Sequence, residues 1–192
     1  MVKALGICAS PRKGGNSEII IDSFLDGVKT CGNSSVNKIF LSDLVIKFCR
    51  EDECCRESGE CDMDDDMRAI YKDFDDADIV AISAPVYFGS IPAKLKLMVD
   101  RFQPHWIKKE VFKKPPLTQK KRKGVFLCVS ASNREDFFKN ARQVIRNLYS
   151  MLGIEYSGEI YCGDVDNRGD IKDKADIISR ACRMGEDLVK NF

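Results

Sequence analysis

The chain has 192 residues, of which 44% are hydrophobic and 32% are charged, a composition typical of one globular domain. Its 31 basic and 30 acidic residues nearly cancel, which argues against binding to nucleic acid or an anionic membrane. No apolar run approaches the roughly 18 residues of a membrane helix, and the apolar part of the N-terminus is too short for a signal peptide. We therefore expect a cytoplasmic protein with a single domain over residues 1–192.

Apolar runs alternate with helix-spaced segments along the chain. Five runs rich in apolar residues predict strands, and several are apolar nearly throughout, as parallel strands covered on both faces are. They span residues 2–9, 35–41, 77–85, 124–131 and 154–161. Helical periodicity predicts helices over residues 18–28, 67–74, 92–101, 136–152 and 171–190. The alternation predicts an α/β fold with a parallel sheet, right-handed crossovers and helices on both faces.

Polar residues mark two of the helix starts. Asn16 or Ser17 is expected to cap the first helix, because such side chains accept hydrogen bonds from free backbone N–H groups. Asp64, Asp65 and Asp66 precede the second helix. Carboxylates there complement the helix dipole, so the triplet predicts a helix start and not a metal site.

Two segments break the alternating pattern. Residues 47–63 are cysteine-rich and aperiodic, and predict a loop. Residues 104–123 contain His105, Trp106 and the basic run 120–123, and predict a surface loop or insertion. We expect the basic run to be a solvated edge and favour a surface role for His105 over a role in covering a ligand.

The loop after the first predicted strand carries an unusual set of donors. Ligands of open parallel sheets bind outside the carboxyl ends of the strands. Here small residues let backbone N–H groups approach an anion, and the following helix N-terminus adds positive charge. Ser10, Asn16 and Ser17 add side-chain donors, and Arg12 adds formal charge. This set favours a terminal phosphate monoester over an ordinary tight turn, and it matches neither the dinucleotide pattern nor the triphosphatase loop.

The loop after the third predicted strand is aromatic. A flat apolar ring with polar edges would suit it, through contact with an aromatic side chain and backbone donors to ring heteroatoms. A loop that merely packs on its neighbours is an equal alternative. Ser130 begins a small polar loop after the fourth strand, which could close over the same ligand. The aromatic loop consists of Pro85, Val86, Tyr87, Phe88 and Gly89.

Nine cysteines are many for a cytosolic chain of this size. Cys8 and Cys128 lie inside predicted strands and are expected to be small buried hydrophobes. Four others fall within thirteen residues, a concentration that indicates a shared purpose. They are Cys49, Cys54, Cys55 and Cys61.

Three motifs in combination resemble the NADPH-dependent FMN reductase superfamily of flavodoxin-like proteins. Within it, the chain is most similar to the iron–sulfur flavoproteins of anaerobic archaea and bacteria, over about residues 3–190. The motifs are Ser10-Pro-Arg-x-Gly-x-Asn-Ser17, Ser83-Ala-Pro-Val-Tyr-Phe-Gly-Ser90 and Lys94-Leu-Lys-x-x-x-Asp-Arg101.

The resemblance implies a flavodoxin-like three-layer sandwich whose five-stranded parallel sheet has the order 2-1-3-4-5. It also implies FMN at the strand carboxyl ends, in a homodimer or homotetramer with the flavin near a subunit interface. The FMN phosphate would lie at Ser10, Arg12, Asn16 and Ser17. The isoalloxazine would contact residues 85–89.

The resemblance further implies a [4Fe–4S] cluster on a compact cysteine motif. Cys49, Cys55 and Cys61 match its first, third and fourth positions, whereas the second is Asp52 and Cys54 is out of register. Four thiolates are the usual ligand set for such a cluster. A cluster with a replaced ligand, a degenerate site and a zinc site therefore all stay open.

Three functions follow from these alternatives. The first is an FMN-dependent electron-transfer flavoprotein that relays electrons from a ferredoxin-like donor through a cluster to a small acceptor. The second is a cluster-free reductase that takes electrons from NAD(P)H. The third is a non-catalytic module with a zinc-stapled loop and no flavin. No residue pattern identifies a catalytic acid, base or nucleophile.

Overall fold

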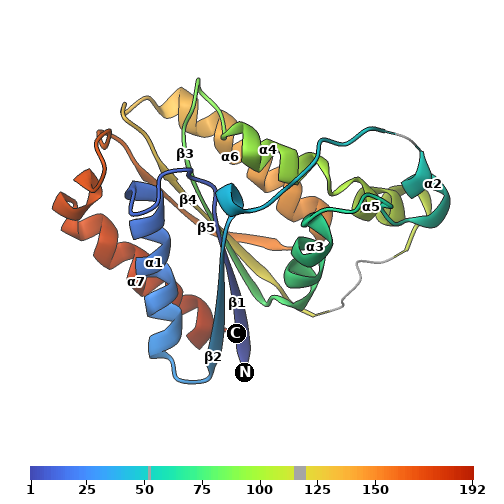
Figure 1. Cartoon of the computed structure of the whole chain (residues 1–192). Helices are drawn as coiled ribbons and strands as arrows, with labels where there is room; N and C mark the ends of the chain where they lie inside the picture. The colour runs from blue at the N-terminus through green and yellow to red at the C-terminus, as the bar shows by residue number, and fades with distance from the viewer. Residues whose placement is uncertain (52, 115–119) are drawn as a thin grey trace.

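The computed structural model describes residues 1–51, 53–114 and 120–192. Five strands and their covering helices alternate along the chain (Figure 1). The strands are β1 Val2–Cys8, β2 Ser34–Phe40, β3 Ile79–Pro85, β4 Lys123–Val129 and β5 Glu155–Cys162. The helices are α1 Asn16–Thr30, α2 Cys54–Ser58, α3 Met67–Asp76, α4 Ala93–Asp100, α5 Gln103–Trp106, α6 Glu135–Leu152 and α7 Ala175–Lys190. No described helix is long and apolar enough to cross a bilayer.

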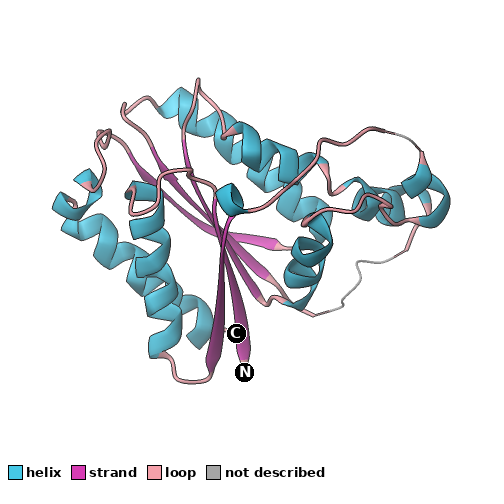
Figure 2. Ribbon diagram, in the orientation of Figure 1, coloured by secondary structure: helices cyan, strands magenta, loops and turns pink. Residues whose placement is uncertain are grey.

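The sheet is parallel throughout and has the order β2-β1-β3-β4-β5, which confirms the predicted topology. Helices α1 and α7 cover one face, and α3, α4 and α6 cover the other (Figure 2). All seven residues of β4 are buried, which explains its continuous apolar character. The order reverses between β1 and β3, so the carboxyl ends of these two strands flank the natural ligand crevice.

Helices α1 and α7 approach each other closely at two glycines. A Cβ atom on Gly27 would lie 1.9 Å from the carbonyl oxygen of Cys182, and one on Gly185 would lie 2.1 Å from that of Phe24. Any larger side chain would force the helices apart. This contact fixes α7, and with it the loop that joins β5 to α7, against the N-terminal part of the chain.

The predicted cap of α1 is wrong. The helix begins at Asn16, and its N-cap residue is Gly15, which makes no side-chain cap hydrogen bond. The side chain of Asn16 points to a different loop, where it has four backbone partners. A tertiary contact has therefore replaced the local cap.

The two segments that interrupt the alternating pattern contain helical turns as well as loop. The cysteine-rich segment holds the short helix α2, and Gln103–Trp106 forms α5 before a π-helical turn over Ile107–Val111. Residues 115–119 lie outside the described part. His105 is only 12% exposed in its side chain, packed against the rings of Tyr71 and Phe102, so its predicted surface role is wrong.

Only the first half of the basic run is a solvated edge, since Lys120 and Lys121 are exposed. Arg122 and Lys123 are buried, and Lys123 is the first residue of β4. Arg122 donates to the carbonyl oxygens of Phe74 and Leu152, and Lys123 donates to that of Asn191. Arg122 thus bonds to the last turns of α3 and α6, and Lys123 bonds to the residue that follows α7. A run of charges in the sequence does not indicate these contacts.

Candidate functional site

A cleft of about 280 Å³ opens at the carboxyl ends of the strands. It brings together nearly all the residues predicted to bind a cofactor: Ser10, Arg12, Asn16, Ser17, Pro85, Val86, Tyr87, Phe88 and Ser130. Gly89 is the exception. It is buried, its backbone faces the ring of Phe137, and its carbonyl accepts a hydrogen bond from Asn140.

The loop from β1 to α1 forms one end of the cleft. Ser10 and Ser17 are almost completely buried, so their hydroxyl groups are held in place at the helix N-terminus. The Ser10 hydroxyl accepts the backbone N–H of Arg12 at 3.1 Å. The N–H groups of Gly14 and Gly15 are already donated, to the carboxylate of Glu18 and to the carbonyl oxygen of Arg12, so these two groups are not available to an anion.

Asn16 lines the cleft but uses its side-chain amide to hold another loop. Its Nδ2 donates to the carbonyl oxygens of Val165 and Asn167, at 3.4 and 2.9 Å. Its Oδ1 accepts the N–H groups of Gly169 and Ile171, at 3.0 and 3.2 Å. The amide is therefore engaged on both sides, and we expect Asn16 to shape the cleft rather than to donate directly to a phosphate.

The loop that follows β5 forms a wall of the cleft that the sequence motifs do not include. Val165, Asp166 and Arg168 line the cleft. A signal for this wall exists in the sequence, since a polar segment follows the last strand and the carboxyl ends of parallel strands share one edge of the sheet. The segment contains Gly163 and Gly169 but no aromatic residue and no recognisable motif, so its pattern alone does not indicate a binding role.

The aromatic loop is a tight turn with an unusual backbone. Tyr87 and Ser90 exchange both of their backbone hydrogen bonds, at 2.9 and 3.0 Å. The two residues between them, Phe88 and Gly89, have φ values of 49° and 73°. Such a turn favours Asn-Gly, because a bulky side chain is strained at positive φ. Phe88 is nevertheless fully exposed at the rim of the cleft, so burial of its ring does not offset the strain of its backbone.

We expect Phe88→Asn to stabilise the fold and weaken flavin binding at the same time. Asparagine tolerates the left-handed region, and relief of the strain should contribute about 0.5–1 kcal/mol. Urea unfolding of the apoprotein and titration with FMN measure the two effects. Phe48→Asn is the control, since Phe48 is also exposed but has an ordinary φ. Tighter FMN binding by Phe88→Asn would contradict a binding role for the ring.

The four clustered cysteines do not converge in the structure. Cys54 and Cys61 line one cavity of about 560 Å³, which Tyr71 and His105 also line, whereas Cys49 and Cys55 are not among its lining residues. Within the described ranges no three Cys, His, Asp or Glu side chains are placed to share a metal ion. Asp52, the residue at the second motif position, lies outside the described residues. In the part of the chain that the structure describes, the four cysteines are therefore not brought together around one ion, and the predicted metal site stays a prediction.

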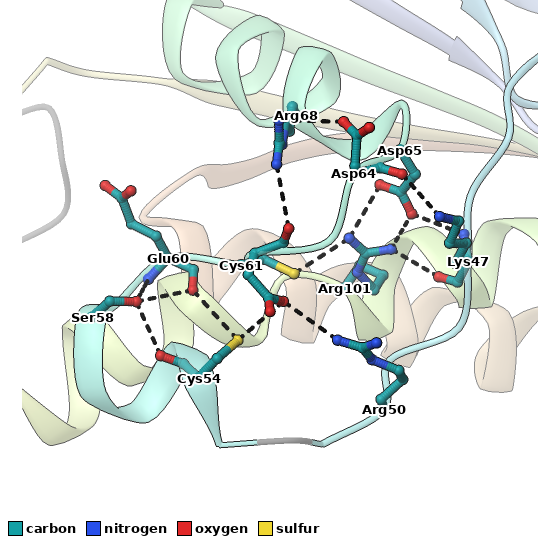
Figure 3. A network of polar contacts seen from close by, with 11 residues as sticks. Lys47, Arg50, Cys54, Ser58, Glu60, Cys61, Asp64, Asp65, Arg68 and Arg101 are labelled. Atoms are coloured by element: carbon teal, nitrogen blue, oxygen red, sulfur yellow. Dashed lines mark hydrogen bonds and ion pairs between the residues drawn. The ribbon is translucent and has the colours of Figure 1, made fainter.

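A buried ion pair underlies the cysteine-rich segment (Figure 3). The side chains of Asp65 and Arg101 are 0% and 1% exposed. The Arg101 guanidinium forks onto the Asp65 carboxylate and also donates to Cys61 Sγ at 3.4 Å and to the carbonyl oxygen of Lys47 at 2.9 Å. Arg101, the last residue of the third sequence motif, thus ties α4 to the segment before α3.

The acidic triplet has two functions in this network. Asp66 is the N-cap residue of α3, as the predicted helix start requires. Asp65 accepts the N–H groups of Lys47 and Met67 besides its bond with Arg101. Burial acts to raise the pKa of Asp65, but the hydrogen bond from Arg101 and those from the backbone outweigh it and hold the pKa below its usual range.

The two cysteines predicted to lie within strands are buried, as expected. Cys8 and Cys128 are completely buried, on β1 and β4. Burial raises the pKa of both thiols above the ordinary range, so they remain protonated and unreactive.

The fold and the cleft place the chain in a class of flavin proteins. The model of the family described as NADPH-dependent FMN reductase matches residues 2–160. An iron–sulfur flavoprotein of Methanosarcina thermophila is 31% identical over 170 residues, which cover 88% of this chain and 82% of the relative. One from Methanocaldococcus jannaschii is 34% identical over 103 residues, 54% of this chain and 53% of that protein. The chain therefore belongs to the NADPH-dependent FMN reductase family, a family of FMN-dependent oxidoreductases.

Solved structures agree on the architecture. A flavone reductase superposes with a TM-score of 0.72 at 17% identity, over 98% of this chain and 62% of that one. An NAD(P)H:quinone oxidoreductase from Methanothermobacter marburgensis gives a TM-score of 0.67 at 19% identity, over 97% of this chain and 96% of the other. At these identities the likeness establishes the flavodoxin-like fold and no more.

Proposed function

We propose that the cleft holds FMN and that the protein reduces it with NAD(P)H and passes the electrons to a small acceptor such as a quinone or oxygen. The observation that supports this most is the convergence of four loops on one cleft, which has a polar end and an apolar end. Buried hydroxyls and two arginines would suit a phosphate monoester. Pro85, Val86 and Val129 would suit the edge of a flat ring.

The chain's own residues bind and orient the cofactor. FMN, when bound, takes a hydride or passes single electrons, so the redox chemistry belongs to the flavin. Arg12, Tyr87, Asp166 and Arg168 are the ionisable side chains among the lining residues. The arginines and Asp166 belong to the phosphate end, so the ring end offers backbone groups, aromatic surface and, as its ionisable group, the hydroxyl of Tyr87.

An anaerobic titration of the FMN-loaded protein tests the donor. One equivalent of NADPH or NADH per flavin is expected to bleach the flavin absorbance fully. If neither nucleotide bleaches the flavin but a reduced ferredoxin-like protein does, the proposal is overturned. The electron donor would then be the one-electron carrier. Oxidation of the reduced protein by a quinone and by oxygen then identifies the acceptor class.

Electron relay through a [4Fe–4S] cluster is the second candidate function. It is favoured by the cysteine motif and by relatives that are named iron–sulfur flavoproteins. The described thiols do not fit such a group. Cys61 accepts a hydrogen bond from Arg101, Cys54 donates one to Asp62, and no three described ligand side chains surround a common point. We therefore derive no step through it. Iron and sulfide assays on protein purified without oxygen test this candidate. About four irons per chain would establish the cluster, and protein without iron would rule it out.

The cellular location and the oligomeric state are also proposals. We propose a reducing, cytoplasmic location, in which the cysteines would not be oxidised to disulfides. We also propose a homodimer or homotetramer, which sedimentation of the FMN-loaded protein would measure.

A further inference from the structure

We propose that Arg168, from the loop after β5, is a second cationic arm of the flavin phosphate site and makes the cleft selective for a flavin monophosphate. The inference rests on the proposed FMN cleft. It assigns a binding role to a segment outside the three sequence motifs and outside the matched family region, which ends at residue 160.

Two arginines join the walls of the cleft reciprocally. Arg12, on the β1–α1 loop, donates from Nη1 to the carbonyl oxygen of Asp166 at 3.2 Å. Arg168, on the facing loop, donates from Nη2 to the carbonyl oxygen of Lys13. Each guanidinium thus crosses to the opposite loop and anchors there by one bond. Since a guanidinium has five N–H donors, further donors remain for an anion in the cleft that both side chains line.

The loop that carries Arg168 is held rigidly. The Asp170 carboxylate accepts the N–H groups of Asp166 and Asn167, at 3.0 and 2.7 Å. The Asn16 amide fixes the same loop from the other side through its four backbone bonds. A preorganised arm loses little conformational freedom on binding, so more of its interaction energy appears as affinity.

The charges at this end favour a phosphate monoester. Arg12 and Arg168 are two cations, and Asp166 also lines the cleft with one carboxylate. The nearby charges of Lys13 and Glu18 are paired with Asp43 at 2.7 Å and with Lys38 at 3.2 Å. A terminal phosphate carries close to two negative charges and accepts planar guanidinium forks. Riboflavin has no phosphate, and the diphosphate of FAD is esterified at both ends, so it has no terminal phosphate with two negative charges.

The test compares flavins with and without the phosphate. Arg168→Gln is expected to weaken FMN binding by about 10-fold or more, the loss typical of a hydrogen bond to a charged group. Riboflavin binding is expected to change less than about 2-fold, because only the phosphate contact is lost. Flavin fluorescence titrations of the apoprotein measure both. Arg180→Gln is the matched control, since Arg180 is an exposed arginine outside the cleft that donates to the carbonyl oxygen of Glu159 at 3.4 Å.

Two further variants separate a charge effect from loop damage. Arg168→Lys should recover part of the FMN affinity, and Asp166→Asn should tighten FMN while leaving riboflavin unchanged. Equal weakening of FMN and riboflavin by Arg168→Gln would overturn the phosphate role and leave a structural one. Unchanged FMN binding would overturn it as well. Wild-type protein that binds neither flavin would instead overturn the proposed function itself.

Discussion

Asp65→Asn is expected to lower the free energy of unfolding by about 3–5 kcal/mol, the usual cost of leaving one member of a buried ion pair without its partner. The substitution keeps the size of the side chain but leaves the Arg101 guanidinium buried and uncompensated. It also weakens the acceptor for the N–H groups of Lys47 and Met67. Urea unfolding of the apoprotein at neutral pH measures the loss.

Asp100→Asn is the matched control for this prediction. Asp100 pairs with Lys96 at 2.7 Å, but both side chains are about half exposed, and such surface pairs contribute about 0–1 kcal/mol. A loss at Asp65 no larger than the loss at Asp100 would show that the buried pair does not hold the cysteine-rich segment.

The Asp65 effect should also depend on pH in one direction. Because the pKa of Asp65 is lowered in the folded state, its contribution to stability is present above the unfolded pKa of about 3.9 and is lost as the pH falls through the folded value. The difference between wild type and Asp65→Asn should therefore be constant near neutrality and shrink in acid. A difference that instead grows below about pH 4 would contradict this linkage.

Asn16→Ala is expected to destabilise the protein by about 2–4 kcal/mol and to weaken FMN binding by about 10-fold or more. The buried N–H groups of Gly169 and Ile171 lose their acceptor, and the carbonyls of Val165 and Asn167 lose their donor. The wall of the cleft that carries Arg168 is then no longer fixed. Unfolding and FMN titration on the same preparation give both numbers.

Gln143→Ala provides the comparison for Asn16. The Gln143 amide bonds to Asn147 on the exposed face of α6, at 2.8 Å, and its removal should cost less than about 0.5 kcal/mol. If Asn16→Ala destabilises the protein but leaves FMN affinity intact, the amide supports the fold only, and the β5–α7 loop does not contribute to binding.

The pattern of the amino acids is enough to predict the parallel α/β class and most of the cleft, whereas the strand order is predicted only through the family resemblance. Continuous apolar runs such as that of β4 predict buried parallel strands, since only strands covered on both faces are apolar throughout. Parallel strands bring their carboxyl ends to one edge of the sheet, so the loops that begin at Ser10, Pro85 and Ser130 are expected to meet there, and they do. These inferences need only local pattern and topology.

Which side chains remain for a ligand depends instead on the packing of distant segments. Asn16 and Asp65 are polar residues at helix starts, yet their partners lie far along the chain, in the β5–α7 loop and next to α4. Arg122 and Lys123 are likewise buried against distant carbonyls. Long polar side chains find such partners only after the core has packed, because a lone charge or amide would not be buried unpaired. The spacing of residues in the sequence predicts contacts between near neighbours along the chain. The contacts of these buried polar side chains depend instead on the positions that α7 and α4 take in the folded protein.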